Sequence, residues 1–186
     1  MRLEKTFRTS LQFLILVVIG AVCINCQNGM QSPCIQQQEV SAAEAQLALD
    51  NALVKQGCDY EWGGNGPVVF DCSGLIVWAY WQSLGRRDIY FDGSYVVSDV
   101  SMQSLYDYNV RRISAEQVIP GDLIFITYDK GFISHGGLVV GVDDTSVQFI
   151  NASSHFDEVV LDEWKKSETV RGQWIEAFGR LKICVQ

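Results

Sequence analysis

One stretch of the sequence, Val68 to Tyr80, constrains the fold more than any other because its character changes in the middle. An apolar run of β-prone residues leads into Asp71 and Cys72, and the small pair Ser73-Gly74 is followed by apolar residues at helical spacing. This change of period predicts a helix that begins at Cys72, with Asp71 as a favourable cap before it. The predicted helix carries a thiol in its first turn.

A thiol at this position is a candidate nucleophile. The N-terminal end of a helix favours negative charge, so we expect a thiol there to ionise more easily, and the thiolate is the reactive form. The alternative for any single cysteine is a small buried side chain without a chemical role. A catalytic cysteine needs a base, which is usually a histidine oriented by a third polar group.

The chain has two histidines, and the sequence favours one of them as the base. His135 begins a predicted strand, and the glycines Gly136 and Gly137 beside it leave room for a substrate or for the helix of Cys72. His155 lies in a segment typical of a loop. We therefore predict His135 as the base. For either histidine the alternative is an ordinary surface or core residue.

Asn151 is the predicted third group. Residues 136–142 and 146–151 are expected to form two antiparallel strands joined by a tight turn, which brings their paired ends together. The amide oxygen of Asn151 can then accept the imidazole N–H and fix the tautomer of His135. A neutral amide stabilises an imidazolium less than a carboxylate would.

Length and charge exclude some classes of protein. A chain of 186 residues fits one domain and a short additional segment, and its apolar fraction of 48% is sufficient for a substantial core. The net charge of −8 argues against a nucleic-acid partner, which requires a basic surface.

Residues 1–26 are typical of an export signal. Three basic residues precede an apolar run, Leu11 to Ile24, that is shorter than the about 20 residues needed to span a bilayer. Lipid attachment at Cys26 or Cys23, simple cleavage and an uncleaved short membrane anchor all remain open. Residues 27–41 are polar and are interpreted as a flexible tether, so the predicted domain covers residues 42–186.

The six cysteines do not form a metal-binding pattern, so no metal or other cofactor is expected. Outside the signal and Cys72, the remaining ones are Cys34, Cys58 and Cys184. Three cysteines allow at most one disulfide, and the sequence does not show which pair forms it.

The remaining patterns predict an α+β order. A capping box at Ser41 and Glu44 opens a helix with an apolar stripe that stops at Gly57, and a short helix is expected near 98–106. The pattern of the second half of the chain predicts antiparallel strands. The residues of the stripe are Ala43, Leu47, Leu49, Leu53 and Val54, and the strands are 122–127, 136–142, 146–151, 158–161 and 177–183.

Taken together, the motifs resemble those of the NlpC-type cell-wall peptidases, which are papain-like cysteine peptidases of bacteria. The resemblance covers roughly residues 42–183 and rests on segments that come in the family's order. These are Tyr-Glu-Trp-Gly-Gly at 60–64, Phe-Asp-Cys-Ser-Gly-Leu at 70–75, Pro-Gly-Asp-Leu-Ile-Phe at 120–125, Ser-His-Gly-Gly-Leu-Val-Val-Gly at 134–141 and Ile-Asn-Ala-Ser at 150–153.

The resemblance implies a papain-like fold in which N-terminal helices, with the nucleophile at a helix N-terminus, pack on a mainly antiparallel sheet. It implies Cys72 as nucleophile, His135 as base and Asn151 as orienting group, although the family most often has His at this third position. Tyr60 would lie near the oxyanion.

The resemblance also implies that Asp71 and Ser73 flank the substrate peptide and hold its free amine. The packing alternative is that Tyr60 and Trp62 are core aromatics and that Asp71 only caps the helix.

The expected function is that of an exported cysteine endopeptidase of the cell envelope, at the periplasm or cell surface. By resemblance, it cuts peptidoglycan stem peptides between D-γ-glutamate and a diamino acid. One alternative keeps the thiol chemistry in an amidase or acyl-transferase with another substrate. Another is a catalytically inactive envelope protein that binds wall peptides. The sequence does not indicate an oligomeric state.

Overall fold

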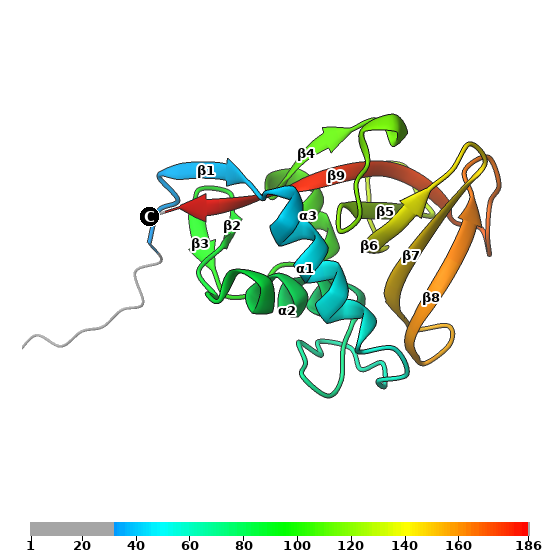
Figure 1. Cartoon of the computed structure of the whole chain (residues 1–186), viewed down its shortest axis with the longest axis horizontal. Coiled ribbons are helices and arrows are strands. Elements are labelled where there is room, and N and C mark those ends of the chain that lie inside the picture. Colours follow the sequence, from blue (N-terminus) through cyan, green and yellow to red (C-terminus); the bar gives the residue numbers. More distant parts are fainter. Residues whose placement is uncertain (1–31, 186) are drawn as a thin grey trace, which may run out of the picture. The chain divides into compact units, whose positions relative to one another are not determined.

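The computed structural model describes residues 32–185 (Figure 1). The predicted export signal, with Cys23 and Cys26, lies outside this range. Within residues 32–185 no helix has the length and apolar character needed to cross a membrane. In chain order the elements are β1 (Gln36–Glu39), α1 (Ala42–Leu53), α2 (Cys72–Leu84), β2 (Tyr90–Asp92), β3 (Tyr95–Val97), α3 (Met102–Tyr108), β4 (Val110–Ile113), the short 3-10 helix η1 (Ala115–Gln117), β5 (Leu123–Thr127), β6 (His135–Val142), β7 (Ser146–Ser153), β8 (Glu158–Lys165) and β9 (Trp174–Val185).

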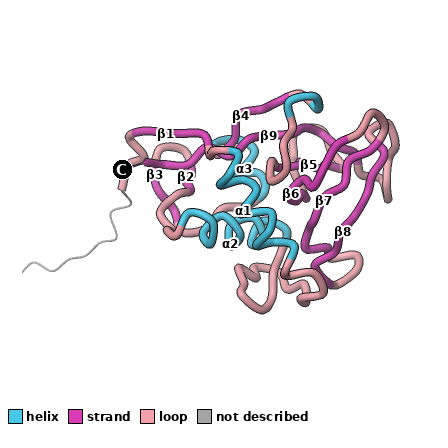
Figure 2. Tube along the Cα trace, viewed as in Figure 1, coloured by secondary structure: helices cyan, strands magenta, loops and turns pink. Residues whose placement is uncertain are grey.

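The large sheet has seven strands in the order β1-β9-β5-β6-β7-β8, and β4 also pairs with β9. Every pairing in it is antiparallel. Strand β6, which is almost continuous in apolar residues, lies between β5 and β7 in the interior of the sheet. Figure 2 shows the helices gathered beside the sheet, so the predicted α+β architecture is confirmed.

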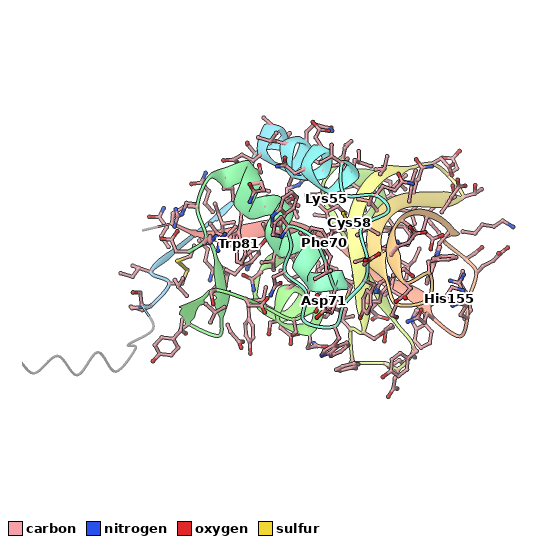
Figure 3. The ribbon with its side chains drawn as sticks, turned by 90° about the horizontal axis from the view of Figure 1, so that it is seen from below. Lys55, Cys58, Phe70, Asp71, Trp81 and His155 are labelled. Carbon is pink, nitrogen blue, oxygen red and sulfur yellow. A yellow bond between two sulfur atoms is a disulfide. The ribbon has the colours of Figure 1, made fainter. Side chains whose placement is uncertain are left out.

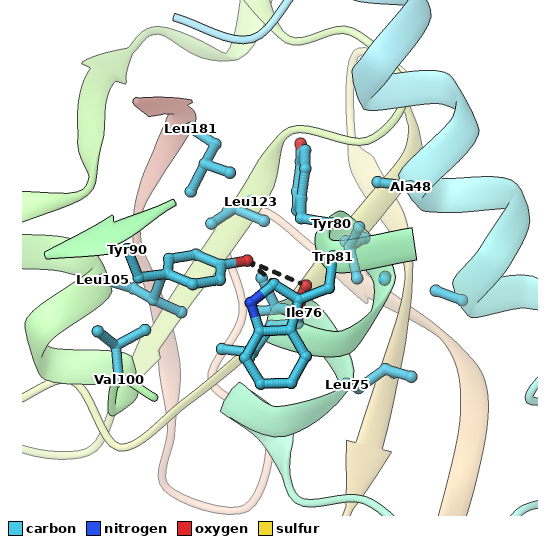
Figure 4. Close-up of a cluster of buried hydrophobic side chains, with 14 of the residues drawn as sticks. Ala48, Leu75, Ile76, Tyr80, Trp81, Tyr90, Val100, Leu105, Leu123 and Leu181 are labelled. Carbon is cyan, nitrogen blue, oxygen red and sulfur yellow. Dashed lines mark hydrogen bonds between the residues drawn. The ribbon is translucent and has the colours of Figure 1, made fainter. Parts of the chain in front are cut away.

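The apolar helix α2 is anchored in the main core. Its residues Leu75, Ile76, Val77 and Tyr80 are fully buried. Burial of one of the three aliphatic side chains contributes roughly 1.5–3 kcal/mol. The Tyr90 hydroxyl donates to the Ile76 carbonyl over 3.3 Å, which ties the β2–β3 hairpin to the helix (Figure 4). This packing holds the first turn of α2 in a fixed position relative to the sheet.

Helix α1 begins with the predicted capping box but buries a different face from the one predicted. The Ser41 amide donates to the Glu44 carboxylate over 2.7 Å, and the Glu44 amide donates to Ser41 Oγ over 3.3 Å. Leu47 and Val54 of the predicted stripe are exposed. Leu49 of the stripe is buried as predicted, and the other buried residues are the alanines Ala45, Ala48 and Ala52.

The reason is the neighbouring helix. Helix α1 packs closely against α2, and small side chains let two helix backbones approach. The helix also ends at Leu53 rather than near Gly57, so Val54 is the exposed cap residue.

The segment predicted as a tether is folded over most of its described part. Strand β1 pairs with the end of β9, with Gln36 opposite Val185 and Glu39 opposite Lys182. A disulfide joins Cys34 to Cys184, with a Cα–Cα distance of 5.5 Å. All four residues of β1 are exposed, so a polar sequence is compatible with this edge strand. Cys58 is the free member of the three cysteines considered from the sequence.

The Pro-Gly-Asp segment before β5 has a structural role. Asp122 is fully buried, and its carboxylate accepts two hydrogen bonds from the Arg180 guanidinium, at 3.0 and 2.8 Å. The same carboxylate accepts the Ile119 amide over 2.9 Å. A buried charge is stable only when it is paired and hydrogen-bonded in this way. Asp122 therefore fixes the start of β5 against β9.

Candidate active site

Helix α2 begins at Cys72, as predicted, and Asp71 is its cap. One carboxylate oxygen of Asp71 accepts the Gly74 amide over 2.7 Å, and the helix ends at Gly85 in the left-handed conformation. The thiol therefore lies in the first turn of a helix whose other side is buried in the core.

His135 and Asn151 come together across two neighbouring strands. His135 is the first residue of β6, Asn151 lies near the end of β7, and His135 Nε2 is 2.9 Å from Asn151 Oδ1. The Asn151 amide nitrogen donates to the Val160 carbonyl over 3.4 Å, which turns its oxygen toward the imidazole. The oxygen can only accept, so Nε2 carries the proton and Nδ1 of the neutral ring remains free to act as an acceptor.

A single pocket joins these groups to the thiol. Cys72, His135, Asn151 and Tyr60 all line it, and we call it the His135 pocket. His155 lines it as well, from the exposed turn after β7. Within residues 32–185 the side-chain partners of Asn151 are His135 and Val160, so the hydrogen-bonded pair is formed by His135 and not by His155.

The electrostatics of the thiol differ from the prediction. Burial raises the pKa of Cys72 to about 12, and the charge of Asp71 acts in the same direction. The backbone amides of Ser73 and Cys72 lower this pKa, as expected at a helix N-terminus, but their effect is smaller. The resting thiol is therefore protonated.

The imidazole is neutral for a related reason. Burial lowers the pKa of His135, while its hydrogen bond to Asn151 and the charge of Asp162 raise it in part. Burial also raises the pKa of Tyr60, as do the charge of Asp71 and any negative charge that forms on Cys72, so its hydroxyl keeps its proton and can donate. The site thus holds a protonated thiol, a neutral base and a phenolic donor.

A second cavity, next to the first, is also lined by Cys72. Asp71, Ser73, Tyr128 and Phe132 line this Asp71 cavity together with Cys72. Figure 3 shows Asp71 at the start of α2 and His155 at the edge of the sheet. Trp62 and Ser134 line both spaces, so the two form one cleft that passes the sulfur.

Both carboxylate oxygens of Asp71 are already used by the fold. Oδ1 accepts the Gly74 amide and the Ser73 hydroxyl, the latter over 3.0 Å, and Oδ2 accepts the Gly63 amide over 2.9 Å. The packing alternative considered for Asp71, a helix cap, is therefore present in the structure. Its predicted contact with a substrate amine stays a prediction.

The glycines after His135 do not provide room for a substrate. A side chain at Gly136 would collide with the Ile124 carbonyl and with Met102. One at Gly137 would collide with the Ile150 carbonyl and would press on Asn151 Cβ. These glycines allow β5, β7 and α3 to approach β6 closely, so the neighbours that need the room are these elements and not, as expected from the sequence, a substrate or the helix of Cys72.

Sequence reasoning missed several residues of the His135 pocket. Asp162 and Trp164 lie on β8, and the Trp164 indole donates to the Asp162 carboxylate over 3.1 Å. Arg171 and Gln173 come from the turn before β9. The alternation along β8 gives some signal for the first two, whereas nothing local points to the turn.

Residues 57–175 match the sequence profile of the NlpC/P60 family. The chain belongs to the NlpC/P60 family. This confirms the resemblance inferred from the five motifs, and the match contains Cys72, His135 and Asn151.

Known NlpC/P60 proteins resemble the chain over about three quarters of its length. It is 34% identical over 145 residues to the probable endopeptidase p60 of Listeria monocytogenes, covering 75% of this chain and 23% of p60. It is 28% identical over 149 residues to the bifunctional muramidase/DL-endopeptidase CwlT of Bacillus subtilis, covering 74% of this chain and 36% of CwlT. The chain thus spans less than two fifths of these relatives' lengths.

A solved structure supports the fold. The chain matches NlpC1 from Trichomonas vaginalis with a TM-score of 0.55 and 25% identity, covering 78% of this chain and 47% of that one. The predicted fold class, papain-like α+β, agrees with this neighbour.

Proposed function

We propose that this protein is an exported cysteine endopeptidase that hydrolyses peptidoglycan stem peptides between D-γ-glutamate and a diamino acid. The observation that carries the proposal is the pairing of His135 with Asn151 in a pocket that Cys72 also lines. Two relatives named endopeptidases support the reaction class. The basic and apolar N-terminal pattern supports export, with or without a lipid or membrane anchor.

In the proposed reaction the free Nδ1 of His135 takes the thiol proton as the sulfur attacks the scissile carbonyl carbon. This order follows from the high pKa of Cys72, because the resting thiol is neutral. The oxyanion that forms accepts hydrogen bonds from the Cys72 backbone amide and the Tyr60 hydroxyl. The negative charge that these two donors stabilise develops only in the transition state, and for this reason their hydrogen bonds accelerate the reaction.

The tetrahedral intermediate then collapses. The C–N bond breaks, protonated His135 gives its proton to the leaving amine, and the acyl group stays on Cys72 as a thioester. A water molecule, deprotonated by His135, attacks the thioester. The C–S bond then breaks, the acid is released, and protonated His135 returns its proton to the Cys72 sulfur. Asn151 keeps the imidazole in the required tautomer and orientation throughout.

The test is digestion of defined muropeptides followed by mass spectrometry. The expected products are an L-Ala-D-Glu fragment and a fragment whose new N-terminus is the diamino acid. Cys72→Ser is expected to abolish them, while Cys58→Ser, which changes the other free cysteine, leaves them unchanged. Unchanged cleavage by Cys72→Ser would contradict the proposal. Release at the sugar–L-Ala bond instead would identify an amidase.

A further inference from the structure

The turn between β8 and β9 contains a residue that its backbone does not favour. Val170 and Gln173 exchange two backbone hydrogen bonds, at 2.8 and 2.9 Å, and enclose Arg171 and Gly172. Both enclosed residues have positive φ, 51° and 79°. This is the pattern of a type I′ turn, which strongly prefers Asn-Gly, Asp-Gly or Gly-Gly. Arginine is therefore held in a conformation that costs energy.

The side chain of Arg171 has a position that explains its presence. It lines the His135 pocket, and its guanidinium lies over the Phe156 ring, 5.0 Å from the centroid. None of the ion pairs formed within residues 32–185 involves it. The guanidinium is thus exposed, rests on an aromatic ring and is not neutralised by a carboxylate of the chain within residues 32–185. Such a cation is suited to bind the carboxylate of a ligand.

The chemistry assigns a direction to the cleft. The leaving amine must take its proton from His135, and His135 lines the pocket of Arg171 but not the Asp71 cavity. The acyl part remains attached to Cys72, which lines both. The leaving amino acid therefore occupies the side of Arg171.

We infer that Arg171 binds a carboxylate of the leaving amino acid and so selects a diamino acid that carries a free carboxylate over one that does not. The inference rests on the proposed function and specifies its substrate. The carboxylate belongs either to the side chain, as in diaminopimelate but not lysine, or to the C-terminus of the leaving fragment. Both sources offer the planar, two-oxygen group that a guanidinium binds.

Three peptides with the same L-Ala-D-γ-Glu acyl part separate these sources. The first ends in diaminopimelate with a free side-chain carboxylate and an amidated C-terminus. The second has the side chain amidated and the C-terminus free. The third ends in lysine amide and has no carboxylate on the leaving side. Wild-type kcat/KM is expected to be about tenfold higher for the first or the second than for the third, the effect of one exposed charge-assisted contact.

Arg171→Asn is the decisive variant, because asparagine is favoured at this turn position. Its melting temperature is expected to equal that of the wild type or to exceed it by about 2 to 4 °C. The preference for the carboxylate peptide is nevertheless expected to disappear, with the lysine peptide cleaved at the wild-type rate. Arg171→Lys should retain part of the preference. A structural role alone would not separate stability from selectivity in this way.

Arg87→Gln is the matched control. Arg87 also lies over an aromatic ring, that of Trp81 at 4.9 Å. Trp81 lies in the last turn of α2, at the end opposite Asp71 (Figure 3). Its removal should leave the preference intact. Equal wild-type rates on all three peptides, or a preference that survives Arg171→Asn, would overturn the inference alone. Failure of the wild type to cleave any of the three would overturn the proposed function and, with it, the inference.

Discussion

The two sides of the cleft differ in how their polar groups are used. On the side of the Asp71 cavity, the carboxylate of Asp71 and the hydroxyl of Ser73 are bonded to each other and to the first turn of α2. On the other side, His135 uses one ring nitrogen for Asn151 and keeps the second, and Arg171 has no ion-pair partner within residues 32–185. Asp71 thus spends most of its bonding capacity on the fold, with three accepted hydrogen bonds, whereas His135 and Arg171 keep more of theirs for a ligand.

The largest expected effect is a loss of activity on the side of the cleft that contains His135. His135→Ala should lower kcat/KM on muropeptides by about 10²–10⁴-fold, the usual contribution of a general acid–base group. His155→Ala is the comparison variant, because this histidine lines the same pocket without bonding Asn151, and it should cost less than about tenfold. Steady-state kinetics on one defined substrate measures both, and equal losses would remove the distinction between the two histidines.

On the opposite side, the main effect should be on stability. Asp71→Ala removes the N-cap of α2 and leaves the Gly74 and Gly63 amides without their acceptor, so we expect a loss of about 1–2 kcal/mol in the free energy of unfolding. Asp71→Asn retains an oxygen for the cap and should lose less. Denaturant unfolding gives the free energies.

The activity of these Asp71 variants then tests the comparison directly. If Asp71 also holds the substrate amine, as the resemblance implies, the loss of activity should be larger for a peptide with a free N-terminal alanine than for the acetylated peptide. An equal relative change for both peptides would leave Asp71 with the cap role alone.

The smallest effect concerns pH. Asp162 raises the pKa of His135, so Asp162→Asn should lower that pKa further and extend activity to lower pH, because the neutral imidazole is the base. Burial already places the acid limb of kcat/KM below the ordinary histidine value of 6.5, and the substitution should move it down by a fraction of a unit. Glu163→Gln, on the opposite face of β8, is the control. An acid limb of kcat/KM that moves to higher pH in Asp162→Asn, or that moves equally in Asp162→Asn and Glu163→Gln, would contradict this account.

The elements that could be predicted from sequence are those with local signals. The capping box of Ser41, the change of period at Cys72 and the apolar run after His135 each lie within a few residues, and all three mark real element starts. Strand β1, the β2–β3 hairpin and β4 were missed because they are short. Pairing of β1 and β4 with β9 joins residues far apart in the chain.

The parts of the site that could not be predicted depend on tertiary packing. Burial decides the pKa of Cys72 against the local effect of its helix, and burial is not visible in the motif. Helix α1 buries alanines where larger residues were expected. The close approach of the neighbouring helix α2 requires these small side chains, and the sequence of α1 alone does not show that approach. Arg171 lines the pocket only because β8 and β9 bring its turn there.

The disulfide between Cys34 and Cys184 has a topological consequence. It joins two residues separated by 150 positions, so it closes a ring that contains the whole cleft. A protease that cuts one peptide bond inside this ring does not divide the molecule, and the nicked chain migrates as one species until a reductant is added.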